Sequence, residues 1–174
     1  MIRTDVVDGI ASLELHRPEV RNAINRELSD AISRQLDEWA AREDVRVVIV
    51  SGAGGKAFAA GADIAELKQR SHVQAFLAWA GRTFQQLEDF PRPTIAAIDG
   101  YALGGGLELA LACDLRVASK GAKIGMPEVG LGIFPSAGGT WRLPRLVGLG
   151  RAKELIYTGR IVDVAEAALW GLFE

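Results

Sequence analysis

The sequence predicts a single α/β domain, because short apolar runs with the length of a buried strand alternate with longer amphipathic stretches. Residues 45–50 and 94–98 are two such runs, and residues 25–41 and 72–88 carry apolar side chains at helical spacing. The chain has 174 residues, of which 49% are hydrophobic, enough for one domain with a substantial core.

The first elements are predicted to be a β-hairpin and a helix. Residues 2–7 and 10–16 have the pattern of two strands, and the Asp-Gly pair at 8–9 favours the tight turn of a hairpin. Asn25 is a good helix cap, and an apolar stripe follows it as far as Ala41. We therefore expect a helix over residues 25–41.

The middle of the chain is predicted to hold two strands separated by a second long helix. Residues 45–50 are mostly β-branched, which is typical of a strand buried on both faces, and a glycine-rich loop follows at 51–55. Prolines 91 and 93 favour extended backbone before a strand at 94–98. The apolar face of the helix at 72–88 would consist of Val73, Phe76, Leu77, Ala80, Phe84 and Leu87.

The last third of the chain is predicted to contain two short strands and three helices. The strands are expected at 115–118 and 123–125. The Gly-Gly-Thr segment at 138–140 precedes a helical stretch to Val147, and further helices are expected at 151–157 and 164–169.

Charge and composition exclude several function classes. The formal net charge is −2 and there is no long basic block, so nucleic acid and anionic membrane are not expected partners. The N-terminus has no signal-peptide core, and no run of about 18 apolar residues could form a transmembrane helix. His16 and His72 lie far apart without ligand-like neighbours, which predicts that no metal is bound.

The single cysteine, Cys113, cannot form an internal disulfide, which is compatible with a reducing compartment and a cytoplasmic location. Cys113 lies in a predicted apolar helix. It is therefore expected to be a small buried core residue rather than a reactive thiol.

The most informative segment is Gly-Gly-Gly-Leu-Glu at 104–108, which follows the apolar run at 94–98 and opens a predicted helix. Three glycines leave backbone N–H groups unshielded, and a helix N-terminus adds partial positive charge there. Such a place would stabilise a carbonyl oxygen that gains negative charge during a reaction. Glu108 lies within the first turn, where it could act on carbons next to that carbonyl.

A second glycine segment, Ala-Ala-Gly-Ala-Asp at 59–63, follows the strand predicted at 45–50 and also opens a helix. If the two preceding strands are neighbours, both loops face one crevice and their N–H groups can converge as an oxyanion hole. Glu128 supplies a second carboxylate. Paired carboxyls can hold one water, one acting as base and the other as acid, and crowding would separate their pKa values.

Each of these features alone has a simpler explanation. Three glycines are most often a tight turn, Glu108 could be only a favourable partner for the helix dipole, and Glu128 could be a solvated loop residue. Asp63 is more readily a helix cap than a catalyst. The functional interpretation depends on their joint occurrence in this order and spacing.

Five segments in register resemble the crotonase superfamily, that is, the enoyl-CoA hydratase/isomerase family, and the resemblance extends over essentially the whole chain. The segments are RPEVRNAIN at 17–25, FAAGADI at 58–64, AIDGYALGGGLE at 97–108, PEVGLG at 127–132 and PSAGGT at 135–140.

This resemblance implies a crotonase-like spiral of ββα repeats, usually assembled as a homotrimer or hexamer, and an acyl-CoA thioester as substrate. By motif position, the backbone N–H groups of Ala62 and Gly105 would hold the thioester oxygen. Glu108 and Glu128 would add water across a 2,3-double bond to give a 3-hydroxyacyl-CoA. No metal or redox cofactor is implied, since coenzyme A is part of the substrate. The implied substrate-binding residues are Val20, Arg21, Ala23, Ala60, Ala62, Asp63, Ile64, Tyr101, Gly104, Gly105, Pro127 and Ser136.

The chain departs from the family pattern in two ways. Ser136 stands where relatives commonly have glycine, beside the water and acyl pocket. The family usually continues for several dozen residues, with a helical segment that often covers the acyl pocket. Residues 1–174 are therefore expected to be the N-terminal core domain without that segment.

Two other functions remain open at this stage. An enoyl-CoA isomerase of the same family often retains one of the two acids, so the presence of both Glu108 and Glu128 favours a hydratase. A non-catalytic RNA-binding or scaffold relative is a candidate of another class, and the mild acidity of the chain speaks against it.

Overall fold

The structure is a computed structural model that describes residues 1–69 and 79–174, and these residues form two sheets and the helices that pack against them. The larger sheet has the strand order β1-β2-β3-β5-β7, with β1 Ile2–Val7, β2 Ile10–Leu15, β3 Val47–Gly52, β5 Thr94–Ile98 and β7 Leu115–Ala118. The smaller sheet has the order β4-β6-β8-β9, with β4 Ala57–Ala59, β6 Tyr101–Leu103, β8 Lys123–Gly125 and β9 Ile161–Asp163. The α/β class predicted from the sequence is confirmed.

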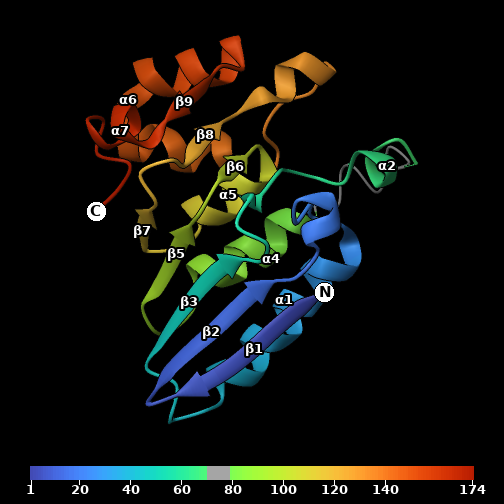
Figure 1. The fold of residues 1–174 in the computed structure, drawn as a ribbon, viewed down its shortest axis with the longest axis vertical. Coiled ribbons are helices and arrows are strands. Elements are labelled where there is room, and N and C mark those ends of the chain that lie inside the picture. The colour runs from blue at the N-terminus through green and yellow to red at the C-terminus, as the bar shows by residue number, and fades with distance from the viewer. Residues whose placement is uncertain (70–78) are drawn as a thin grey trace.

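The helices gather at two places (Figure 1). The helices α1 and α4 pack together behind the larger sheet, whereas α6 and α7 lie with the smaller sheet at the opposite end. The helical bounds are α1 Arg26–Ala40, α2 Ile64–Leu67, α4 Trp79–Glu88, α5 Gly105–Leu111, α6 Gly139–Thr158 and α7 Val164–Ala168, with 3-10 helices at Pro18–Val20 and Pro127–Leu131.

The predicted hairpin and first helix are both confirmed. Asp8 and Gly9 have φ values of 52° and 84°, the left-handed pair that a two-residue hairpin turn requires, and β1 pairs with β2 antiparallel. Asn25 caps α1 by accepting a hydrogen bond from the Leu28 N–H at 2.9 Å. Because β2 pairs with β3 in parallel, the chain must cross over between them, and α1 supplies that crossover.

The core lies between the larger sheet and its helices. The inward side chains of β2 are buried; they are Ala11, Leu13 and Leu15. The apolar stripe of α1 is buried against them and consists of Leu28, Ile32, Leu36 and Trp39. On β3, Val48 and Val50 are buried, but Val47 and Ile49 are only half-buried. The prediction that this strand is buried on both faces is therefore wrong, because α1 and α4 cover the same face of the sheet (Figure 1).

The remaining helices agree with the sequence in type and differ in their bounds. The helix predicted at 72–88 is confirmed over residues 79–88, which form α4. Residues 72–78 lie outside the described residues. The two helices predicted before and after residue 148 form α6, whose backbone breaks at Gly148 with φ 78° and ψ 159°. Cys113 is buried as expected, and burial raises the pKa of its thiol to about 12.

Three strands were not predicted, and all three belong to the smaller sheet: β4, β6 and β9. Each has three residues and shows no clear local pattern. The strands predicted at 115–118 and 123–125 are confirmed as β7 and β8. Within the described ranges, no helix is long and apolar enough to cross a membrane, and no cluster of three His, Cys, Asp or Glu side chains could hold a metal ion.

Candidate active site

Two glycine-bearing loops lie side by side at the ends of neighbouring strands. The strands β4 and β6 pair in parallel, so the loop 60–63 after β4 and the loop at Gly104 after β6 emerge at the same edge of the smaller sheet. A Cβ on Gly105 would lie 3.5 Å from the Ala62 nitrogen, which places the two backbone nitrogens close together. The two loops therefore lie next to each other as predicted, although the strands before them belong to the smaller sheet rather than being the pair β3 and β5.

The glycines in these loops are required by close packing. Gly61 has φ 105°, and a side chain there would bring its Cβ within 3.2 Å of the Leu103 carbonyl oxygen. Gly104 has φ 50°, and its Cβ would lie 2.8 Å from the Glu128 Oε1 atom. The missing side chain at Gly104 thus leaves the space that the Glu128 carboxyl occupies.

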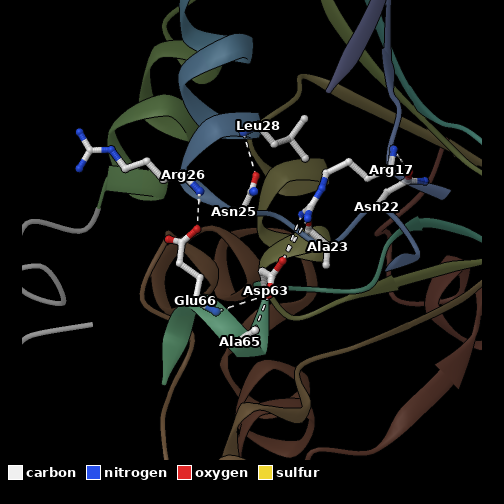
Figure 2. Close-up of polar contacts among 9 residues, drawn as sticks. All are labelled: Arg17, Asn22, Ala23, Asn25, Arg26, Leu28, Asp63, Ala65 and Glu66. Atoms are coloured by element: carbon white, nitrogen blue, oxygen red, sulfur yellow. Dashed lines mark hydrogen bonds and ion pairs between the residues drawn. The ribbon is translucent and has the colours of Figure 1, made fainter. Parts of the chain in front are cut away.

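The loop that contains Ala62 is hydrogen-bonded to the segment of chain that precedes α1 (Figure 2). Ile24 and Ala62 form a parallel bridge, in which the Ile24 N–H donates to Gly61 at 2.8 Å and the Asp63 N–H donates to Ile24 at 3.0 Å. Asp63 then caps α2 by accepting hydrogen bonds from the N–H groups of Ala65 and Glu66.

Glu108 lies in the first turn of α5 and is almost completely buried. Its Oε1 atom accepts hydrogen bonds from the backbone N–H groups of Ala137, at 2.8 Å, and Gly139, at 2.9 Å. Burial raises the pKa of the Glu108 carboxyl, and these N–H groups oppose that rise because they stabilise the ionised form. Glu108 is therefore a fixed and oriented carboxylate.

Glu128 lies in the 3-10 helix Pro127–Leu131 and is also buried, with an exposed fraction of 9%. Its Oε2 atom has no hydrogen-bond partner among the described residues. Burial raises the pKa of this carboxyl to about 7, and the nearby charge of Glu108 adds to the rise. The two carboxyls thus have the same chemistry but different environments, as expected for paired acids.

Both carboxyls face one cavity of about 400 Å³. The size is in the range of a small-molecule site, and the walls are predominantly apolar with a few polar groups in one place. The predicted site residues that line it are Ala60, Ala62, Ile64, Gly104, Gly105, Glu108, Pro127, Glu128 and Ser136. Its other walls are Ile24, Gly61, Leu67, Trp79, Ala80, Phe84, Gly130, Leu131, Ile133, Phe134 and Ala137.

Five of the predicted substrate-binding residues lie away from the cavity walls. Val20 and Tyr101 are exposed, and Arg21 has a left-handed backbone whose carbonyl accepts a hydrogen bond from the Ala60 N–H at 3.0 Å. The Ala23 carbonyl and the Asp63 carboxylate both accept hydrogen bonds from the Arg17 guanidinium. Their roles in binding a substrate stay predictions.

The sequence interpretation missed the group that holds Glu108 in place. The two N–H groups that bind Glu108 belong to Ala137, in the loop before α6, and to Gly139, the first residue of α6. The Ala137 carbonyl accepts a hydrogen bond from Arg142 at 3.0 Å. Arg142 is 3% exposed and forms an ion pair with Glu88 at 2.6 Å. The glycine pair at 138–139 indicates a helix start in the sequence, but nothing local indicates that the N–H groups of Ala137 and Gly139 bind Glu108.

Comparison with known proteins finds one matching family model and a set of related chains. The family model described as enoyl-CoA hydratase/isomerase matches residues 5–174. The chain is 46% identical over 171 residues to the crotonyl-CoA hydratase of Syntrophomonas wolfei, covering 95% of this chain and 64% of that protein. It is 44% identical over 165 residues to the short-chain-enoyl-CoA hydratase of Clostridium acetobutylicum, covering 94% and 63%.

The fold comparison agrees with the sequence comparison. The crystal structure of an enoyl-CoA hydratase from Bacillus anthracis superposes with a TM-score of 0.95 and 43% identity, covering 99% of this chain and 68% of that one. The chain thus spans just under two thirds of the length of the curated relatives that it matches.

Proposed function

The chain belongs to the enoyl-CoA hydratase/isomerase family, and from that premise we propose that the protein adds water to a 2-enoyl-CoA thioester in a syn sense, giving a 3-hydroxyacyl-CoA. One observation carries the proposal. Two buried carboxyls, Glu108 and Glu128, share an apolar cavity at whose rim the nitrogens of Ala62 and Gly105 converge.

In this proposal the backbone N–H groups of Ala62 and Gly105 bind the thioester oxygen. That oxygen gains negative charge as the enolate-like state forms, and fixed donors stabilise it without reorganisation. Each such donor contributes about 3–4 kcal/mol to lowering the barrier. Binding in the apolar cavity also removes bulk water from the reacting atoms, which strengthens these interactions.

The different environments of the two carboxyls divide the acid and base roles between them. Glu108 accepts two backbone N–H bonds, which favour its ionised form, so it would take a proton from the water whose oxygen bonds to C3. Glu128, with a pKa of about 7 and an unpaired oxygen, would deliver its proton to C2. Return of the proton from Glu108 to Glu128, directly or through solvent, restores the starting state.

The proposed reaction needs no metal or redox cofactor. Addition of water changes no net oxidation state, and the thioester oxygen is stabilised by backbone N–H groups. Coenzyme A enters as part of the substrate.

Two further expectations of the family are also part of the proposal. Assembly into a homotrimer or hexamer is supported by large exposed apolar side chains, of which Phe134, Leu149, Tyr157 and Leu169 are at least 60% exposed. A cytoplasmic location is compatible with the single, buried Cys113, which has no partner for an internal disulfide. Sedimentation of the purified protein measures the first, and fractionation of its cells measures the second.

Product analysis tests the proposed reaction. The purified protein is incubated with crotonyl-CoA in water labelled with heavy oxygen, and the thioester product is analysed by mass spectrometry. We expect a 3-hydroxyacyl-CoA that carries the label on C3. A product with a shifted double bond and no label would instead indicate the isomerase. Lack of any product, together with RNA binding that weakens steeply with salt, would indicate the non-catalytic alternative.

A further inference from the structure

The amide that is proposed to bind the thioester oxygen lies in a loop with almost no side chains of its own to fix it. Residues 60–62 are Ala-Gly-Ala, and their position depends on contacts from other segments. The parallel bridge between Ile24 and Ala62 is the nearest of these contacts. It aligns the backbone on either side of Ala62, since the Ile24 N–H donates to Gly61 and the Ile24 carbonyl accepts from Asp63.

One guanidinium connects both strands of this bridge (Figure 2). Arg17 donates from Nη1 to the Ala23 carbonyl at 2.5 Å and from both Nη atoms to the Asp63 Oδ2 atom, at 3.3 and 3.2 Å. Ala23 precedes Ile24, and Asp63 follows Ala62. The guanidinium therefore fixes the distance between the two segments at the point where they form the bridge.

The backbone of Arg17 is itself fixed by a buried side chain. Its backbone N–H donates to the Asn22 Oδ1 atom at 3.0 Å. Asn22 is completely buried, and its Nδ2 atom donates to the carbonyls of Ala53, at 3.0 Å, and Ala57, at 2.8 Å. Asn22 thus links the backbone of Arg17 to Ala57, which is the first residue of β4, the strand that ends at the Ala62 loop.

We propose that Arg17 and Asp63 are positioning residues that orient the Ala62 N–H toward the thioester oxygen. This inference rests on the proposed function, in which that N–H is an oxyanion donor. Neither side chain lines the cavity, so their effect would pass through the backbone. The side chain of Arg17 is 12% exposed and that of Asp63 is 20% exposed. Screening by solvent is therefore weaker than for a surface pair.

The chemistry of the pair explains why arginine stands here. A planar guanidinium can serve the Ala23 carbonyl and the Asp63 carboxylate at once in fixed directions, which a lysine ammonium cannot. Removing either Arg17 or Asp63 alone leaves the charge of the other side chain partly buried and without its counter-charge. Changing both partners together removes the connection without leaving such a charge, so it isolates the positioning role.

The variants can separate this role from helix capping. Asp63→Asn keeps a side-chain oxygen that can cap α2 but removes the charge that Arg17 binds. Arg17→Lys keeps the positive charge but loses the planar guanidinium that binds Ala23 and Asp63 at once. The double variant Arg17→Met with Asp63→Asn removes the ion pair. The matched control is Arg26→Met combined with Asp30→Asn, which removes an exposed ion pair of α1.

Two measurements are made on each variant after thermal unfolding has shown the temperature range in which it is folded. The first is kcat and KM for hydration of crotonyl-CoA. The second is the absorbance of bound cinnamoyl-CoA, whose conjugated thioester absorbs at longer wavelength when hydrogen bonds polarise its oxygen. The second measurement reports the oxyanion donors without requiring turnover.

We expect Asp63→Asn and Arg17→Lys to lower kcat about 10- to 100-fold, with KM changed by less than about threefold, because a misaligned donor is lost mainly in the transition state. The absorbance shift of bound cinnamoyl-CoA should shrink in parallel. The double variant should be no worse than the poorer single variant, since both singles break one connection. The Arg26/Asp30 control should match the wild type.

Other results would overturn the inference. An unchanged kcat and an unchanged absorbance shift in folded Asp63→Asn and Arg17→Lys would leave the pair only a structural role, and so would a lower melting temperature alone. Failure of the proposed function is distinguishable, because the wild type itself would then hydrate no crotonyl-CoA and shift no absorbance. If Asp63→Asn does not fold, the comparison of Arg17→Lys with the wild type decides the question.

Discussion

Glu108 and Glu128 are the same residue type in two different environments, and their proposed roles rest on that difference. Glu108 accepts hydrogen bonds from the backbone N–H groups of Ala137 and Gly139, whereas one oxygen of Glu128 has no partner among the described residues. Burial alone would raise the pKa of both carboxyls and leave them alike. The N–H groups of Ala137 and Gly139 oppose the rise at Glu108, and for this reason we propose Glu108 as the base and Glu128 as the acid.

The pH dependence of catalysis should report this assignment. Glu128 must be protonated to act as the acid, and its pKa is raised to about 7, so activity is expected below that pH and should be lost above it. Measured as kcat/KM for crotonyl-CoA, activity should fall about tenfold per pH unit on the alkaline side of about pH 7. A profile that is flat to pH 9 would contradict Glu128 as the acid.

The raised pKa of Glu128 also predicts how stability depends on pH. Between its ordinary pKa of 4.5 and about 7, the native state keeps a proton that the unfolded chain has lost, so the free energy of unfolding falls as pH rises through this window. Glu128→Gln carries no such charge. At pH 5 the variant should therefore have the same free energy of unfolding as the wild type. At pH 8 it should be more stable by about 1 kcal/mol or more, which raises Tm by roughly 2–4 °C. Glu43→Gln, at an exposed residue, should show no such difference.

The N–H of Gly105 can be removed with little change to the backbone. Gly105 is the first residue of α5, a position where proline is tolerated, so Gly105→Pro deletes the donor while the helix can still form. We expect kcat to fall about 100-fold or more, with a smaller change in KM. Gly105→Ala keeps the N–H, and its Cβ would make only ordinary contacts at 3.5 Å, so it is the matched control. Equal turnover by a folded Gly105→Pro would remove this donor from the mechanism.

At the scale of elements, the sequence allowed the long segments to be predicted, together with the short strands β7 and β8, but not the other three short strands. The hairpin at Asp8-Gly9, the cap at Asn25 and the break at Gly148 each depend on local chemistry, and each appears where expected. The strands β4 and β6 lead into the two loops of the proposed site, yet each has only three residues and pairs with strands far away in the sequence. Such strands are defined by tertiary pairing, which no local pattern reveals.

The contact between α5 and β4 predicts a large effect of one methyl group. A Cβ on Gly106 would lie 2.1 Å from the Ala59 carbonyl oxygen, a backbone atom that cannot move aside without disturbing the sheet. Gly106→Ala should lower the free energy of unfolding by about 2–3 kcal/mol, as overpacking does. Gly121→Ala is the control, because nothing lies within 4 Å of a Cβ there. Denaturant unfolding of both variants measures the difference, and equal stabilities would contradict the packing described here.

At the scale of the whole molecule, the site is assembled from segments that are distant in the sequence. Ala62, Gly105, Glu108 and Glu128 come from three separate stretches, and the loop that holds Glu108 comes from a fourth. The family resemblance allowed these stretches to be associated before the structure was known, because their motifs occur in a fixed order. It did not reveal the link from Glu88 through Arg142 to the Glu108 loop, which depends on side-chain packing between α4 and α6.

The central claim is that Glu108 and Glu128 together hydrate an enoyl-CoA thioester. The most direct measurement follows loss of the conjugated enoyl-thioester absorbance of crotonyl-CoA with the wild type, Glu108→Gln and Glu128→Gln, each shown to be folded and to bind coenzyme A. The account predicts loss with the wild type and rates at least about 100-fold lower with either variant. Near-normal turnover by either variant would contradict the claim.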